Sequence, residues 1–334
     1  MKRDKSFKTL LWFAAAIGAL LVSMFIAITY GAKQLSLHTV WTAIVYYNPN
    51  DTAHQIVHEL RLPRVLGAVL TGGAFAVAGA LMQGITRNPM ADTGILGVNA
   101  GASFVVACCF AWMPGIAYGP LMIVSFVGAA LSAGFIALLG SATPGGLTSL
   151  KLTVAGAVVA SILHALSSGV AIYYDLIQDL AFWYAGGLAG VRWEHLKLLA
   201  PVVLLIAGWS AAMGRSITFM SLGAETAAGL GVQIGKVKWF GMAAAVVLAG
   251  SSVAAVGSIG FVGLVAPHIA RRLVGVDYRL SIPFSALLGA LLLVWADFAS
   301  RMVHPPREFA IGGMVAMVGV PFFLYLARQE RREL

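Results

Sequence analysis

The block from Thr93 to Leu150 contains no charged residue, and this limits how the chain can fold more than any other feature. About 20 apolar residues carry one helix across the hydrocarbon core of a bilayer, so the block is far too long for a single span. Proline and glycine break helices, and they occur at Pro114-Gly115 and Pro120 and then at Pro144-Gly145-Gly146. The block therefore predicts a helical hairpin within a membrane.

Composition agrees with a protein that crosses the membrane many times. Hydrophobic residues make up 60% of the 334 positions and charged residues only 10%, whereas about 25% charge is typical of soluble domains. We therefore expect an all-α polytopic membrane protein of about ten transmembrane helices, folded as one domain over residues 1–334. The candidate spans are 10–31, 63–83, 93–112, 118–140, 152–173, 198–215, 239–256, a short one at 259–270, 281–300 and 310–326.

The distribution of lysine and arginine predicts the orientation of these spans, because cytoplasmic loops carry an excess of basic residues. With both termini in the cytoplasm, most of the 22 lysines and arginines fall on the inner side, including Arg331 and Arg332. The net charge of +9 follows from this orientation, so no nucleic-acid partner is expected. The outer set is Lys33, Arg61, Arg64, Arg192, Lys197, Arg301 and Arg307.

The stretch 257–272 contains the short eighth span and has features that interrupt a helix. Gly257, Gly260 and Gly263 recur at a spacing of three and are followed by Pro267, which makes a continuous helix unfavourable. One interpretation is a kinked span with glycines at helix contacts, which is common in membrane bundles. The other is a short interrupted span beside a translocation path. The spacing leaves both open.

The residues of this stretch are similar to the G-x-I-G-F-V-G-L-x-x-P-H-x-x-R signature of permease subunits in the ferric-siderophore and vitamin B12 (FecCD-type) family of ABC importers. A second segment, Arg61-Leu62-Pro63-Arg64 through Asn88-Pro89-Met90-Ala91-Asp92, resembles that family's R-L-P-R and N-P-L-A-D-P elements, with Thr93 in place of the last proline. A third resemblance covers Asp297 to Phe323, with Phe309 and Ala310 replacing the usual leucine and proline. Together the matches cover most of residues 61–326, while residues 1–60 match only in character.

The segment 216–238 is the one sizeable polar stretch on the inner side. Alanine and glutamate favour a short helix there, and glycines punctuate it, so it is by itself compatible with an ordinary interfacial helix. It also resembles the family's L-G-x-E-x-A-x-x-L-G element, which implies short coupling helices that dock into the ATPase subunit. Ala224 stands where relatives often have a second acidic residue. The coupling residues that this implies are Leu222, Gly223, Glu225, Ala227, Gly229 and Gly231.

The resemblance implies two further groups of site residues. Arg61, Arg64 and Arg301 would meet acidic residues of an external binding protein, although arginines near a helix end also reach the membrane interface without any partner. Residues of the translocation path or of the packing around it would be Gln83, Asn88, Pro89, Gly260, Gly263, Pro267 and His268.

Several classes of function are disfavoured by the residues themselves. No G-x-x-x-x-G-K-[ST] phosphate loop occurs, so the chain is not expected to hydrolyse ATP or to be an enzyme. Asp297 is the only acidic residue clearly within a span, and pairing with Arg301 one helical turn away is its expected role. An ion-coupled carrier usually needs several such groups, so this class is disfavoured.

The polar segment 216–238 also disfavours a structural or receptor protein. No cofactor or metal is expected.

The resemblance therefore implies the permease subunit of an ATP-driven importer of ferric siderophores in the bacterial cytoplasmic membrane. A vitamin B12 or haem permease, which would use the same motifs, is the alternative. The implied partners are a second permease subunit, identical or related, two ATPase subunits, an extracytoplasmic substrate-binding protein and membrane lipid.

Overall fold

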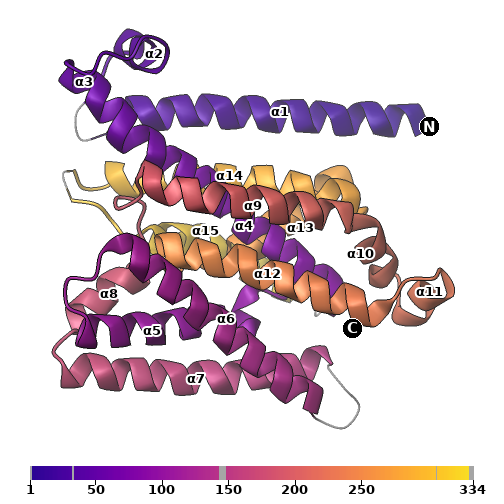
Figure 1. Cartoon of the computed structure of the whole chain (residues 1–334). Helices are drawn as coiled ribbons and strands as arrows, with labels where there is room; N and C mark the ends of the chain where they lie inside the picture. Colours follow the sequence, from indigo (N-terminus) through magenta and orange to yellow (C-terminus); the bar gives the residue numbers. More distant parts are fainter. Residues whose placement is uncertain (1, 32–33, 143–147, 306, 331–334) are drawn as a thin grey trace.

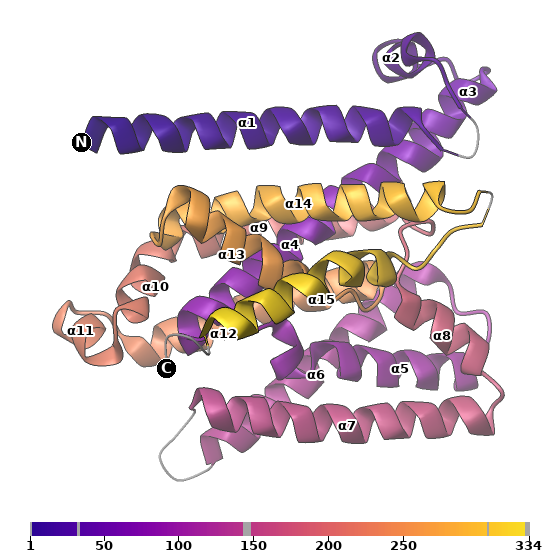
Figure 2. The ribbon, with the colours of Figure 1, turned by 180° about the vertical axis from the view of Figure 1, so that it is seen from behind.

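The computed structural model describes residues 2–31, 34–142, 148–305 and 307–330. Its described part is a bundle of helices whose longest members run between two ends (Figures 1 and 2). In chain order the elements are α1 (Lys2–Thr29), α2 (Leu37–Val45), α3 (Thr52–Gln55), η1 (Ile56–Arg61), α4 (Leu62–Thr86), η2 (Thr93–Leu96), α5 (Val98–Trp112), α6 (Tyr118–Ala142), α7 (Ser149–Tyr173), α8 (Ile177–Ala185), α9 (Trp193–Ala212), α10 (Gly214–Ser221), α11 (Ala224–Gly229), α12 (Ile234–Val256), α13 (Val262–Val274), α14 (Tyr278–Met302) and α15 (Ile311–Glu330).

Two ends of the bundle are distinguished by their short helices (Figure 1). One end, called the α2 end below, carries α2, α3 and α8. The opposite end, called the α11 end, carries α10 and α11, and both chain termini lie toward it. The placement of both termini toward one end agrees with an even number of crossings. Their cytoplasmic location stays a prediction.

Each of the ten predicted spans contains a helix, and the described residues form an all-α fold apart from an isolated bridge between His304 and Arg307. Among the described residues, 7 helices are long and apolar enough to cross a membrane. α5, α13 and the apolar part of α15 (Ile311–Leu326) are shorter, so the number of crossings stays a prediction. The uncharged block forms the hairpin α5–α6 as expected. Pro144-Gly145-Gly146, Lys33, Arg331 and Arg332 lie outside the described residues.

α4 is the central helix of the bundle, and it crosses behind and between its neighbours in both views (Figures 1 and 2). Every residue from Thr71 to Ile85 is buried. A helix that is apolar on all sides lies either among other elements or in lipid, and α4 is covered mostly by other helices. α14 packs along α4 so closely that a Cβ on Gly72 would overlap the carbonyl of Gly289, and a Cβ on Gly289 would overlap that of Gly72. Small residues therefore bring the two backbones into direct contact.

The predicted interruption lies between α12 and α13. The first helix ends at Val256, Gly257 has a φ of 80° and Phe261 a φ of 67°, and the second helix begins at Val262. A positive φ is rare for a residue as bulky as phenylalanine, so this turn stores backbone strain. α13 starts directly against the middle of α4, because a Cβ on Gly79 would overlap the carbonyl of Gly263.

Gly260 and Gly263, the second and third glycines of the interruption, differ in their surroundings. Gly263 fits a close approach: a Cβ there would lie 2.8 Å from Asp92 Oδ1 and 2.9 Å from the Phe75 carbonyl oxygen. Gly260 differs, because a Cβ there would meet nothing within 4 Å in the described part of this chain, and its place on the path stays a prediction. Gly260 precedes the first turn of α13, at a point where the chain has not yet reached α4.

Candidate functional site

A buried network of arginines and carboxylates occupies the α2 end. Arg64, in the first turn of α4, donates from Nε to Asp297 Oδ1 at 2.8 Å. Its Nη1 and Nη2 donate to the two oxygens of Glu308 at 2.6 and 2.9 Å. Arg301 Nη2 lies 3.2 Å from Asp297 Oδ2, which confirms the expected pairing one turn away. The Asp297 side chain is only 1% exposed, so it reaches both arginines out of contact with solvent.

Two of the arginines also bind the last turn of α1. Arg61 Nη1 donates to the carbonyl oxygens of Ile28 and Thr29 at 2.6 and 2.8 Å. Arg301 donates to those of Ala27 and Tyr30 at 3.1 and 3.2 Å. The last four carbonyls of a helix have no partner within it, and the helix dipole favours a cation there. The network thus fastens α1 to η1 and α14.

These contacts change what the sequence suggests for the three arginines. Arg61, Arg64 and Arg301 do share one end of the bundle, but each is 8% exposed and has acceptors within the chain. Glu308 is the most accessible member of the network, with its side chain 41% exposed. The link from Arg64 to Asp297 and Glu308 was missed, because no spacing rule relates positions so far apart. Contact of these arginines with an external protein stays a prediction.

The bonds from Arg64 predict that the contribution of Glu308 to the stability of the folded state depends on pH. Hydrogen bonds from Arg64 hold the pKa of the Glu308 carboxyl below its ordinary value of 4.5. A carboxyl whose pKa is lower in the folded state than in the unfolded state stabilises the folded state when the pH is above the unfolded-state pKa. This stabilisation is lost as the pH falls through the folded-state pKa. The melting temperature of Glu308→Gln should therefore lie below that of the wild type at pH 7, and the difference should shrink below about pH 4.5. Glu194→Gln, an exposed carboxyl at the same end, is the control; a difference that is constant with pH would contradict this role.

A second group of predicted residues meets at the start of α13. Gln83 is 2% exposed and donates from Nε2 to the carbonyl oxygen of Gly263 at 3.0 Å. Asp92 lies on the other side of Gly263 and caps η2 by accepting from the Thr93 N–H at 2.7 Å. Burial raises the pKa of the Asp92 carboxyl. Gln83 thus bonds α4 to the start of α13, and Asp92, which the sequence does not single out as a site residue, lies close to Gly263.

The other predicted path residues lie further away. Pro267 is buried within α13, and the ring of His268 packs edge-on against Phe322 of α15, with centroids 5.5 Å apart. Asn88 and Pro89 are exposed in the turn after α4, where Asn88 Oδ1 accepts from the Met90 N–H at 2.9 Å. The structure therefore brings Gln83 and Gly263 together and leaves the Asn88–Pro89 turn at the α11 end.

The projecting element of the α11 end is built from α10 and α11 (Figure 1). The expected short helix is confirmed, but 216–238 is not one loop: α10 covers its first part, and α12 already begins at Ile234. Gly223 (φ 127°) and Gly231 (φ 79°) form the turns on either side of α11. Ala227 is fully buried and anchors the element. Leu222 and Glu225 are exposed, and Gly229 ends the helix.

α10 is connected to the rest of the bundle through the start of α14. Thr218 Oγ1 lies 3.3 Å from Asp277 Oδ1, and it accepts from the Tyr278 N–H at 2.9 Å. Asp277 in turn binds Arg279 at 2.6 Å. α10 is thus bonded to the start of α14, which is the main neighbour of α4.

A bundle of long apolar helices around one buried helix, with an interrupted helix against it, is the architecture of a polytopic membrane protein. The chain belongs to the FecCD transport family, whose sequence profile matches residues 19–329. This confirms the family predicted from the sequence motifs.

Two relatives and one solved structure illustrate the similarity. The chain is 46% identical to the iron(3+)-hydroxamate import system permease protein FhuB of Bacillus subtilis, over 99% of this chain and 86% of that protein. It is 38% identical to the ferric enterobactin transport system permease protein FepD of Escherichia coli, over 96% of each. A solved structure, described as an inward-facing conformation of a metal-chelate type ABC transporter, superposes with a TM-score of 0.84 at 25% identity, covering 96% of this chain and 99% of that one.

Proposed function

We propose that the chain is the permease subunit of an ATP-driven importer that carries ferric siderophores across the bacterial cytoplasmic membrane. The observation that carries the proposal is the similarity over nearly the whole chain to permeases of iron(3+)-hydroxamate and ferric enterobactin systems. Residues 1–334 would act as one permease domain, and a second permease subunit, identical or related, would complete the translocation path.

The energy source would be a pair of ATPase subunits at the α11 end. α11 projects there with Leu222 and Glu225 exposed, and α10 behind it is bonded to α14. We propose that closure of the ATPases pushes α11 and α10, that α14 moves with them, and that α4 and the start of α13 follow because their backbones are in contact. The chain would thereby change the path without any covalent chemistry of its own.

Reversing the charge of Glu225 tests this coupling. Placing like charges at a contact costs several kcal/mol, so Glu225→Arg should lower ATP-driven uptake by about tenfold or more. Membrane insertion should be unchanged, because Glu225 is exposed and lies outside the bundle. Uptake and copurification of the ATPase would be measured together, with Glu225→Gln as the control, because it removes the charge without placing a like charge at the contact. Normal uptake and normal ATPase binding by Glu225→Arg would remove this residue from the contact.

An external binding protein would dock at the α2 end. Because Arg61, Arg64 and Arg301 are engaged within the chain, their charge reversal would also damage the internal network. A cleaner test leaves the permease unchanged and measures the affinity of the cognate binding protein at two salt concentrations. Docking through charges predicts weaker binding at high salt, since ions screen exposed pairs. An affinity that does not depend on salt would exclude an electrostatic contact.

The whole proposal is tested by reconstitution with the cognate ATPase and binding protein. ATP-dependent uptake of a ferric hydroxamate or ferric catecholate is the expected result, and cobalamin and haem are the comparison substrates. Uptake of cobalamin or haem alone would replace the siderophore assignment. Uptake driven by an ion gradient without ATP would overturn the proposal; Asp297, held between two arginines, is poorly suited to carry a coupling ion.

A further inference from the structure

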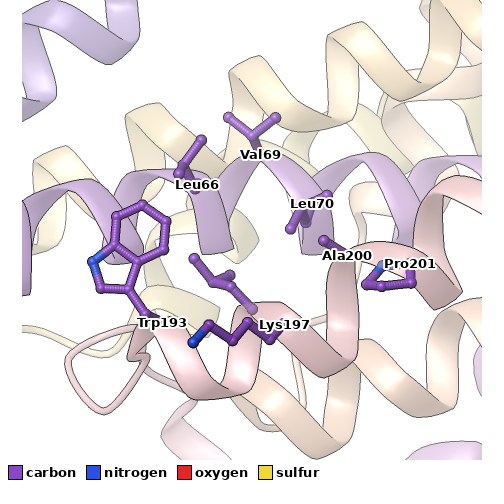
Figure 3. Close-up of a pocket in the computed structure, with 8 residues that line it drawn as sticks. Leu66, Val69, Leu70, Trp193, Lys197, Ala200 and Pro201 are labelled. Carbon is purple, nitrogen blue, oxygen red and sulfur yellow. The ribbon is translucent and has the colours of Figure 1, made fainter.

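A lateral groove lies between α4 and α9 near the α2 end (Figure 3). Its volume is about 470 Å³. One wall consists of Leu66, Val69 and Leu70, and these three are the residues between Pro63 and Ile85 of α4 that are not buried. The opposite wall includes the small side chains of Ala200 and Pro201 on α9. The groove is therefore the place where the central helix meets the surroundings of the bundle.

The groove has the depth of one half of a bilayer. Its α9 wall runs from Trp193 to Pro201, which at 1.5 Å per residue is about 12 Å. Half of a hydrocarbon core of about 30 Å is about 15 Å. Trp193 lies at the end of the span, where tryptophan is enriched at membrane interfaces. An acyl chain of one leaflet would thus fit along the groove.

One cationic residue, Lys197, lies on the α9 wall among these apolar side chains. Figure 3 shows the amine of Lys197 directed back toward Trp193. Within the described part of the chain, no carboxylate lies within ion-pair distance of Lys197, and its side chain is exposed. The Trp193 Nε1–H donates to the His58 carbonyl oxygen at 2.8 Å, so the polar edge of the indole is occupied and its ring is fixed. The groove thus offers apolar walls with one positive charge, which is directed toward the Trp193 end.

An occupant must match both parts of this surface. A ferric chelate is rich in oxygen and would find no donor in the groove besides Lys197. A phospholipid with an anionic head matches it, because its chain is apolar and its phosphate binds lysine. We infer that the α4–α9 groove binds one anionic phospholipid, with an acyl chain along Leu66, Val69 and Leu70 and the phosphate on the Lys197 ammonium. This site does not depend on the transported substrate.

Quenching of Trp193 by brominated lipids tests the site. The full chain would be reconstituted in phosphatidylcholine vesicles with increasing amounts of phosphatidylglycerol, with bromine on the acyl chains of one lipid or of the other. Subtracting the emission of Trp193→Phe isolates Trp193 among the 8 tryptophans. One lysine near an anionic headgroup gives about a five-fold preference. Half-quenching should therefore occur at about a five-fold lower fraction of brominated phosphatidylglycerol than of brominated phosphatidylcholine.

Charge variants decide whether Lys197 selects the lipid. Lys197→Gln should abolish the preference and Lys197→Arg should retain it. Arg307→Gln removes one exposed charge at the same end, outside the groove, and should retain it too. Equal quenching by the two lipids in the wild type, or a preference that survives Lys197→Gln, would overturn the inference. Absence of Trp193 quenching would also overturn it, because protein and not lipid would then cover the groove.

A second variant does not rely on Trp193. Ala200→Phe fills the groove with a ring while leaving the lysine in place. Mass spectrometry of the intact chain should find one phosphatidylglycerol fewer on this variant than on the wild type. Equal numbers of bound phosphatidylglycerol on the two proteins would contradict a site in this groove.

Discussion

Asp297→Asn is expected to destabilise the protein by about 3–5 kcal/mol, because it leaves two arginines buried without the carboxylate they share. Asparagine keeps the size of the side chain, so the change isolates the charge. Arg64 would retain Glu308 as its only carboxylate. Arg301 would keep no carboxylate, only backbone carbonyl oxygens, such as those of Ala27 and Tyr30, and the ring of Phe298. Thermal or denaturant unfolding of the purified chain measures the loss, and we expect reduced yields of folded protein as well.

A matched pair at the other end of the same helix provides the control. Asp277 binds Arg279 at 2.6 Å, but the two side chains are 31% and 62% exposed. Exposed ion pairs contribute about 0–1 kcal/mol, so Asp277→Asn should be close to neutral. Equal effects of the two substitutions would mean that burial of the Asp297 network has no energetic consequence, which would contradict the role assigned to it here.

Gly79→Ala is expected to separate α4 from α13 and to abolish transport. A Cβ at this position overlaps the carbonyl of Gly263, and backbone atoms cannot move aside as a side-chain end can. Overpacking costs about 1–3 kcal/mol, occasionally more, although alanine is favoured over glycine in a helix by about 1 kcal/mol. Gly263→Leu should act in the same way, because it meets Asp92 and the Phe75 carbonyl.

Gly260→Ala is the control that shows whether any added side chain between α12 and α13 impairs the protein, or only one that overlaps a neighbouring backbone. A Cβ at Gly260 has open space, so uptake and the melting temperature should stay at wild-type values. Both quantities would be measured for the three variants side by side. Wild-type uptake by Gly79→Ala would show that the contact between the two helices is loose.

Much of the fold follows from the sequence because membrane helices carry a strong local signal. The uncharged block predicts α5–α6, and the glycine pattern predicts the break before α13. Residues 30–60 carried no such signal, so α2, α3 and η1 were missed. The site was predicted less well. Arg61 and Arg64 have the pattern of surface arginines, and their burial depends on Asp297 and the carbonyls of α1, which only the tertiary fold brings near.

The buried network also bears on the order in which the protein assembles. Arg301 and the carbonyl of Ala27 are 274 residues apart in the chain. At about 5–20 residues per second, the ribosome needs on the order of tens of seconds to make the intervening segment. During that time α1 lies in the bilayer without Arg301 and without its main neighbour, and α4 lacks the helix that covers Gly72. Arg61 of η1 is made early and can bind the end of α1, but the contacts of α1 with α14 form only near the end of synthesis, so a chain truncated before α14 should be a substrate for membrane proteases.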